Sequence, residues 1–156
     1  MRGEHVRLAE IELAADEERI LPVRGNCLEL LVELDISQAI GGGLKLCCSA
    51  DDRQRTTVVY NRPKRSLVLS AVPASRDAAQ RSSAVADLAL AEGERLKLHI
   101  FVDRSIVEVF ANGRCCLTSR LYPGPDSQAI RLLANGGPVS LSSLDAWQMK
   151  PIWPTA

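Results

Sequence analysis

Apolar and polar residues alternate with a period of two along much of this chain. The stretch Leu28-Glu-Leu-Leu-Val-Glu-Leu-Asp35 has apolar residues at every even position and acids at most odd ones, and residues 96–103 alternate in the same way. This pattern predicts half-buried β-strands. In residues 6–13 the apolar parity changes between Leu8 and Ile11, which fits a strand with one slip.

The clearest local signal is the stretch Ile100-Phe-Val-Asp-Arg-Ser-Ile-Val-Glu-Val-Phe-Ala-Asn-Gly-Arg114. The polar triplet Asp103-Arg104-Ser105 separates two apolar runs, and Asn112-Gly113 separates the second run from a third that ends at Tyr122. Asn-Gly between such runs is a strong hairpin signal, because both central residues of a type I′ turn need a positive φ. The sequence therefore predicts three antiparallel strands in about 25 residues.

Strands are expected at intervals of 8–12 residues elsewhere, and no segment has a helical period over ten residues. Residues 37–43 end in three glycines and predict a flexible turn, and residues 73–86 predict an extended surface loop, with a helical turn as the alternative. This spacing is typical of an all-β sandwich or closed barrel of antiparallel strands. The further expected strands are 44–48, 56–60, 65–72, 88–90, 130–133 and 139–149.

The length of 156 residues predicts a single domain (1–156), with a linker-like N-terminal segment (1–25), a core (26–150) and a tail (151–156). Nineteen basic and nineteen acidic side chains cancel, so a nucleic-acid partner is not expected. No apolar run is long enough for a membrane span, and no signal-peptide core is present at the N-terminus.

Five cysteines, two pairs of which are adjacent, lie mostly within apolar runs. Neighbouring strand residues point to opposite faces, so the adjacent pairs are poor candidates for disulfides. The spacing of zinc ligands is absent, and neither a metal nor another cofactor is expected. Reduced, buried thiols suit a cytoplasmic protein.

Three segments together resemble a known family. They are Phe101-Val-Asp-Arg-Ser-x-Val-Glu-Val-Phe-x-Asn-Gly-Arg114, Leu117-Thr-Ser-Arg-x-Tyr-Pro123 and Leu144-Asp-Ala-Trp-Gln-Met149. This combination is similar to the C-terminal β-sandwich of glycoside hydrolase family 32, which comprises invertases, inulinases, levanases and other β-fructofuranosidases. The resemblance implies two antiparallel sheets packed face to face, of the concanavalin-like or jelly-roll type.

The same resemblance implies that this chain alone is not an enzyme. Catalytic residues of the family lie in Asn-Asp-Pro, Arg-Asp-Pro and Glu-Cys segments of a five-bladed propeller that precedes the sandwich. This chain contains no Asp-Pro and no Glu-Cys dipeptide. The expected function is therefore a non-catalytic accessory module of an enzyme acting on β-fructosides such as sucrose, inulin or levan.

Two carboxylic acids of the hairpin, Asp103 and Glu108, form the local pair that resembles a catalytic one. Retaining glycoside hydrolysis needs two carboxyl groups roughly 5–5.5 Å apart. An aspartate before a tight turn usually accepts bonds from backbone amides, however, and Glu108 is expected to face solvent or a basic neighbour. We therefore interpret Asp103, Arg104, Glu108 and Arg120 as turn or salt-bridge residues, and we assign no catalytic residue.

Partners are expected to be the catalytic propeller, in the same or a separate chain, or a second copy in a homo-oligomer. The alternative is a stand-alone, lectin-like module that binds fructan or sucrose. Aromatic side chains that stack on sugars or seal an interface are expected at Tyr122, Trp147 and Trp153, whereas Phe101 and Phe110 are expected in the core.

Overall fold

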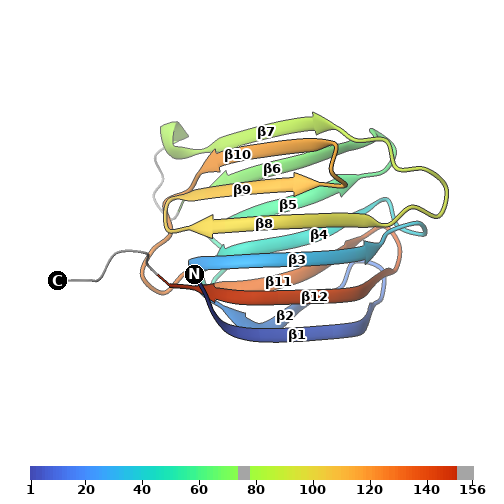
Figure 1. Ribbon diagram of the computed structural model, residues 1–156. Helices are drawn as coiled ribbons and strands as arrows, with labels where there is room; N and C mark the ends of the chain where they lie inside the picture. The colour runs from blue at the N-terminus through green and yellow to red at the C-terminus, as the bar shows by residue number, and fades with distance from the viewer. Residues whose placement is uncertain (74–77, 151–156) are drawn as a thin grey trace.

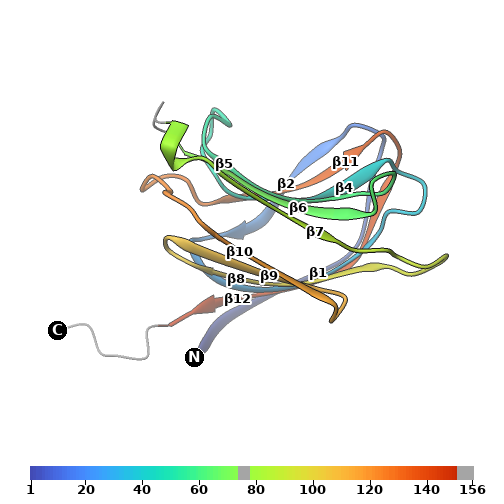
Figure 2. The same cartoon turned by 90° about the horizontal axis from the view of Figure 1, so that it is seen from above.

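The computed structural model describes residues 1–73 and 78–150 of the chain. Twelve β-strands and one short 3-10 helix, η1 (Ala78–Gln80), make up its described secondary structure. The strands form two six-stranded antiparallel sheets that face each other as the two layers of a sandwich (Figures 1 and 2). The predicted all-β sandwich is confirmed.

Each sheet combines strands from the two ends of the chain. Sheet A has the order β1 (Arg2–Leu13), β12 (Val139–Met149), β3 (Cys27–Asp35), β8 (Leu96–Asp103), β9 (Ile106–Ala111) and β10 (Cys115–Arg120). Sheet B has the order β2 (Glu18–Arg24), β11 (Ala129–Asn135), β4 (Gly41–Cys48), β5 (Arg55–Asn61), β6 (Ser66–Val72) and β7 (Ser82–Asp87). Thus β12 lies between β1 and β3, and β11 lies between β2 and β4.

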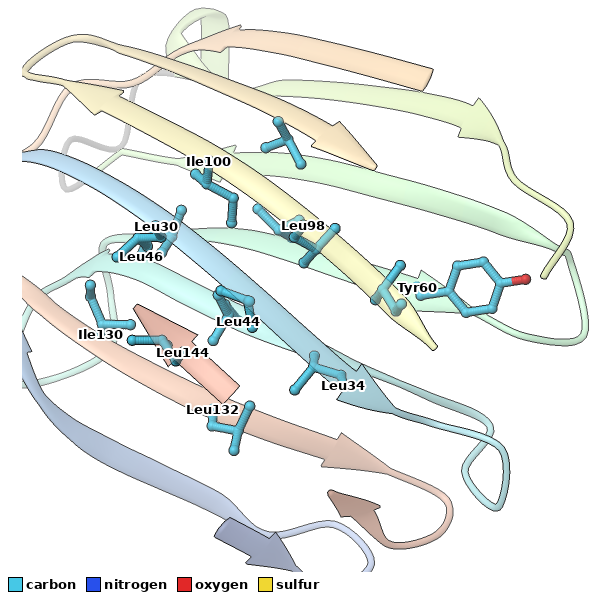
Figure 3. Close-up of a cluster of buried hydrophobic side chains, with 14 of the residues drawn as sticks. Leu30, Leu34, Leu44, Leu46, Tyr60, Leu98, Ile100, Ile130, Leu132 and Leu144 are labelled. Carbon is cyan, nitrogen blue, oxygen red and sulfur yellow. The ribbon is translucent and has the colours of Figure 1, made fainter. Parts of the chain in front are cut away.

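The core lies between the sheets and consists mainly of leucine, valine and isoleucine side chains (Figure 3). Every second residue of each strand points into this layer, as the period-two pattern predicted. Leu30 and Ile100 of sheet A and Leu44 and Leu132 of sheet B are fully buried. Tyr60 is buried with them, and its hydroxyl donates a 2.8 Å hydrogen bond to the carbonyl oxygen of Leu88.

The predicted hairpin turn and strand slip are confirmed. Asn112 and Gly113 both have positive φ, of 49° and 63°, and they join β9 to β10. The slip in β1 lies at Glu10, which has a φ of 56°. On one side of Glu10, Leu8 pairs with Leu144, and on the other side Ile11 pairs with Leu141. The apolar positions of β1 and β12 therefore switch between even and odd residue numbers at the same place along the two strands.

The N-terminal segment differs from the prediction. Residues 1–25 were expected to be linker-like apart from the strand at 6–13, but β1 and β2 occupy most of this segment and pair with β12 and β11 respectively. The polar residues of these strands lie mostly on the solvent side, because only alternate positions need to be apolar. The tail, 151–156, lies outside the described residues.

Three other segments were also predicted wrongly. The glycines Gly41–Gly43 open strand β4 and are not a flexible turn. In the segment 73–86, η1 matches the alternative of a helical turn, but the edge strand β7 was not predicted, because its short serine and alanine side chains have weak strand preference. Leu88 is buried in a loop between strands and forms no strand with Leu90. Among the described residues, no helix is long and apolar enough to cross a membrane.

Candidate functional site

The outer face of sheet A, which points away from the core, carries a group of aromatic and charged side chains. Alternation along each strand brings residues of five strands into rows across this face. One row runs His5, Trp147, Glu29, Phe101 and Glu108, in the order β1, β12, β3, β8 and β9. The next row runs Arg7, Asp145, Leu31, His99 and Phe110.

At the centre of this face Glu29 is held by two partners. Arg2 donates from Nε and Nη2 to the two carboxylate oxygens of Glu29, each at 2.7 Å. His99 donates from Nε2 to Oε1 at 2.9 Å. Only 7 % of the Glu29 side chain is exposed, although it points away from the core. The Arg2 hydrogen bond, which outweighs the opposing effect of burial, lowers the pKa of Glu29 to about 2.

Trp147 lies beside this ion pair and is covered by its neighbours. The guanidinium carbon of Arg2 lies 3.9 Å from the centroid of the indole ring, a cation–π distance. The His5 ring stacks on the indole at 4.8 Å between centroids, and the planes are 9° apart. Asp145 fixes His5 through a 2.8 Å contact between Oδ1 and Nε2. These contacts leave less of the indole available for stacking on a sugar.

A patch of apolar side chains continues from this cluster across β8 and β9. Phe101 and Phe110 meet edge to face with centroids 6.3 Å apart, and the His99 ring packs 4.5 Å from Phe101. Phe110 is 41 % exposed and Ile106 43 %. The prediction that both phenylalanines belong to the core is wrong. Ile100 and Val102 occupy the inward positions beside Phe101 on β8, and Val109 and Ala111 do so beside Phe110 on β9.

A groove of about 630 Å³ is hollowed into this face beside the patch. Its apolar wall includes Leu31 and Phe110, and its polar wall includes Glu33, Lys97 and Asn112. Glu33 and Glu94 of the groove are paired with Arg95 and Arg114, at 3.1 and 2.6 Å. The surface therefore joins an apolar floor to glutamates that are paired with arginines, beside Lys97. This composition suits a protein partner.

The predicted turn and salt-bridge residues also lie at or near this face. Asp103 and Arg104 are at the β8–β9 turn, where Arg104 has a φ of 52° and its amide donates a 2.7 Å hydrogen bond to the carbonyl oxygen of Asn26. Glu108 and Arg120 are exposed. In residues 1–73 and 78–150, none of these four side chains forms an ion pair, so their salt-bridge role stays a prediction.

Of the three predicted aromatic contacts, Trp147 is within the cluster just described and Tyr122 is elsewhere. Tyr122 follows β10, is 43 % exposed and lines a smaller groove at the edge of the sandwich. Trp153 lies outside the described residues. The structure therefore does not bring Tyr122 and Trp147 into one site.

Arg2, His5 and Glu29 of the cluster were not predicted from the sequence as functional residues. The alternating pattern placed Glu29 on the outward side of its strand, but it carries no information about the strands on either side. Arg2 and His5 lie in the segment that was expected to be a linker.

The thiols and carboxylates offer no metal centre within the described part of the chain, where no group of three or more His, Cys, Asp or Glu is suitably placed. All five cysteines are free. Cys47 and Cys48 are buried, and burial raises their pKa to about 12 and about 11. Cys116 is exposed, contrary to the prediction of buried thiols.

Comparison with known families gives one match over almost the whole chain. The family model described as "Glycosyl hydrolases family 32 C terminal" matches residues 2–148. A levanase of Bacillus subtilis is 30 % identical over 136 residues, which are 84 % of this chain and 20 % of that protein. A sucrose-6-phosphate hydrolase of Zymomonas mobilis is 28 % identical over 128 residues, 79 % of this chain and 24 % of that protein. The chain thus spans about a quarter or less of these relatives.

Solved structures show the same fold. An exo-inulinase from Aspergillus awamori superposes with a TM-score of 0.81 at 24 % identity, covering 97 % of this chain and 30 % of that one. Fructan 1-exohydrolase IIa from Cichorium intybus gives a TM-score of 0.75 at 19 % identity, covering 96 % of this chain and 36 % of that one.

Proposed function

The chain belongs to glycosyl hydrolase family 32 as its C-terminal domain, and from this membership we propose that it is the non-catalytic accessory module of a β-fructofuranosidase-type glycoside hydrolase. One relative is named a levanase and another a sucrose-6-phosphate hydrolase, which supports a β-fructoside as the substrate of the whole enzyme. In this proposal the module braces a catalytic propeller that precedes it in the same polypeptide or is a separate chain.

The positions of Asp103 and Glu108 support a non-catalytic role. Asp103 pairs with Ile106 and Phe101 pairs with Glu108, so the two carboxylates are diagonal neighbours across β8 and β9. Both side chains are exposed, and neither lines the groove on the outer face of sheet A.

The observation that carries the bracing role is the apolar patch on the outer face of sheet A. Phe110, Ile106 and Leu31 are exposed there beside a buried, fully paired carboxylate. A partner that covered Phe110 and its apolar neighbours would remove this exposed apolar surface from water. Glu108, Phe110 and Trp147 also belong to the segments that carry the family resemblance, although they point away from the core.

The position of β1 is consistent with the propeller as the partner. The matched family model describes a C-terminal region, so the larger part of such an enzyme precedes it. Arg2, in the first strand, already contacts Glu29 and Trp147 on the outer face of sheet A. A domain attached before this strand would therefore lie next to the patch that we propose it covers.

The length of the native polypeptide tests the first part of this proposal. We expect intact mass spectrometry of the protein from its source cells to give a product several times heavier than the 156-residue chain. That product should hydrolyse sucrose, inulin or levan, and the 156-residue chain alone should not. A native product of 156 residues would refute attachment to a propeller in the same chain.

Substitution of Phe110 tests the docking face. In the whole enzyme, Phe110→Ser should lower the stability of the docked module by about 1–3 kcal/mol, because a buried aromatic side chain is lost from an interface. In the 156-residue chain the same substitution should cost less than about 1 kcal/mol, because Phe110 is already exposed. Thermal unfolding of both proteins gives the comparison.

The matched control is Val85→Ser on the outer face of sheet B, where Val85 is also exposed. We expect it to affect both proteins equally. Equal effects of Phe110→Ser on the two proteins would contradict docking through sheet A. A 156-residue chain that dimerises, and becomes monomeric on Phe110→Ser, would show that a second copy covers the patch instead.

A further inference from the structure

A second groove lies at the edge of the sandwich where β7 of sheet B meets β10 of sheet A. Its volume is about 320 Å³. One wall is formed by residues 79–84, and the other by Thr118, Ser119, Arg120 and Tyr122. The hydroxyl groups of Ser82 and Ser119 are hydrogen-bonded to each other, which ties the two walls together. The groove borders the face of sheet A that we propose for docking, because Arg120 lies opposite Ile106 of β9.

The Tyr122 wall is held in place by buried contacts. The amide of the preceding residue, Leu121, donates a 2.9 Å hydrogen bond to the carbonyl oxygen of Ser105, and Leu121 itself is buried. The buried Gln54 side chain donates to the carbonyl oxygen of Tyr122. The side-chain oxygen of Gln54, Oε1, accepts hydrogen bonds from the backbone amide of Gly124 at 2.8 Å and from the Ser127 hydroxyl at 2.6 Å. Tyr122 is thus displayed on a fixed loop, which lowers the entropic cost of binding.

The charge of this groove differs from that of the sheet A face. Arg81 and Arg120 both line it, and no aspartate or glutamate among the residues that the structure describes does. Within residues 1–73 and 78–150, neither guanidinium has an ion-pair partner, whereas Arg2, Arg95 and Arg114 around the outer face of sheet A are each paired with a carboxylate. The hydroxyl groups of Ser83 and Thr118 add further donors to the lining.

From these three features we propose that the groove beside Tyr122 binds a sugar phosphate. The exposed phenol ring offers an apolar surface with a polar tip, which suits one face of a sugar ring. Guanidinium groups donate paired hydrogen bonds to phosphate oxygens, and hydroxyl groups complement the sugar hydroxyls. Binding at this site is measured on the 156-residue chain without a propeller, so either proposal can fail without the other.

Titration of the 156-residue chain with fructose 6-phosphate tests this site. Isothermal calorimetry at low salt should give one site with a dissociation constant of about 1 mM or below. Fructose and inorganic phosphate, titrated separately, should each bind at least about tenfold more weakly, because each makes only part of the contacts. Added salt should weaken the binding of fructose 6-phosphate, since both arginines are exposed.

Two variants locate the site. Arg120→Gln and Tyr122→Ala should each weaken binding of fructose 6-phosphate by about tenfold, without changing the melting temperature, because both side chains are exposed. Arg24→Gln is the matched control, since Arg24 is an exposed arginine on β2 and does not line this groove. The proposal is overturned if fructose 6-phosphate does not bind, if phosphate or fructose binds equally well, or if Arg120→Gln behaves like Arg24→Gln.

Discussion

At the scale of single residues, Glu29 shows how a charge is kept on an apolar surface. A carboxylate with 7 % of its side chain exposed would be strongly destabilising if it had no partner. Here the two-fold hydrogen bond from Arg2 and the bond from His99 satisfy it, and Trp147 packs against the same arginine. The cluster orders strands β1, β12, β3 and β8 relative to one another on the face that we propose for docking.

Because of this arrangement, part of the protein's free energy of unfolding depends on pH in the acid range. Because the folded-state pKa of Glu29 is lowered from 4.5 to about 2, its contribution is fully present above about pH 4.5 and is lost as pH falls towards 2. We expect Glu29→Gln to lower the free energy of unfolding by about 2 kcal/mol at pH 7, a value reduced from the full pKa shift because Arg2 is half exposed. Urea unfolding at a series of pH values measures the difference.

The difference between Glu29→Gln and the original protein should become small near pH 2. Glu108→Gln provides the control, since Glu108 is exposed on the same face and forms no ion pair with the residues that the structure describes. A loss from Glu29→Gln that is as large at pH 2 as at pH 7 would mean that the carboxylate's charge is not what stabilises the cluster.

The sequence predicted the side of the strand on which Glu29 lies but not its partners. Arg2 and His99 are 27 and 70 positions away in the sequence, and they reach Glu29 only because β1, β12, β3 and β8 are neighbours. Alternation is a property of one strand, whereas a cluster across a sheet depends on the register of several. Phe110 was misplaced for a related reason, since hydrophobicity alone does not identify the inward side of a strand.

At the scale of elements, β4 shows why glycine was misinterpreted. Three consecutive glycines favour a turn when the chain is considered locally. In the sheet they lie between β11 and β5, where a Cβ atom on Gly43 would be 1.9 Å from the carbonyl oxygen of Val58. The absence of a side chain is what permits the close approach of the two strands at this point.

Gly43→Ala should therefore destabilise the protein severely, by about 3 kcal/mol or more, because the clash is with backbone. The matched change is Gly124→Ala, where the nearest atoms to a Cβ are side-chain oxygens at 3.3 and 3.5 Å. It should cost much less. Chemical unfolding of both variants gives the comparison, and similar losses would show that β4 and β5 can separate at low cost.

Elements with local signals were predicted best. The β9–β10 hairpin follows from Asn112-Gly113, whose positive φ values are those that a tight hairpin requires. Strand β7 was missed because its residues are mostly serine and alanine, and because an edge strand needs only one partner. Leu88 was assigned to a strand because it is apolar, although it is buried as part of a loop.

At the scale of the whole molecule, the class of fold followed from the spacing of strands and the choice of a sandwich from the family resemblance. The strand order within each sheet was not predicted from the pattern. The neighbours of β12 are β1 and β3, which are far from it in sequence, and no turn chemistry specifies such a pairing. Contacts of this kind depend on the complementarity of complete faces rather than on local sequence.

The order of strands also has a consequence for the protein during translation. The last two strands, β11 and β12, are each inserted between two of the first four, so β1 and β3 share no hydrogen bonds and neither do β2 and β4. A nascent chain leaves the ribosome from its N-terminus, and these early strands have unpaired edges until almost the whole domain has emerged. Neither sheet can therefore be completed before β11 and β12 have emerged, and a ribosome that stalls before residue 129 releases a chain that lacks both strands.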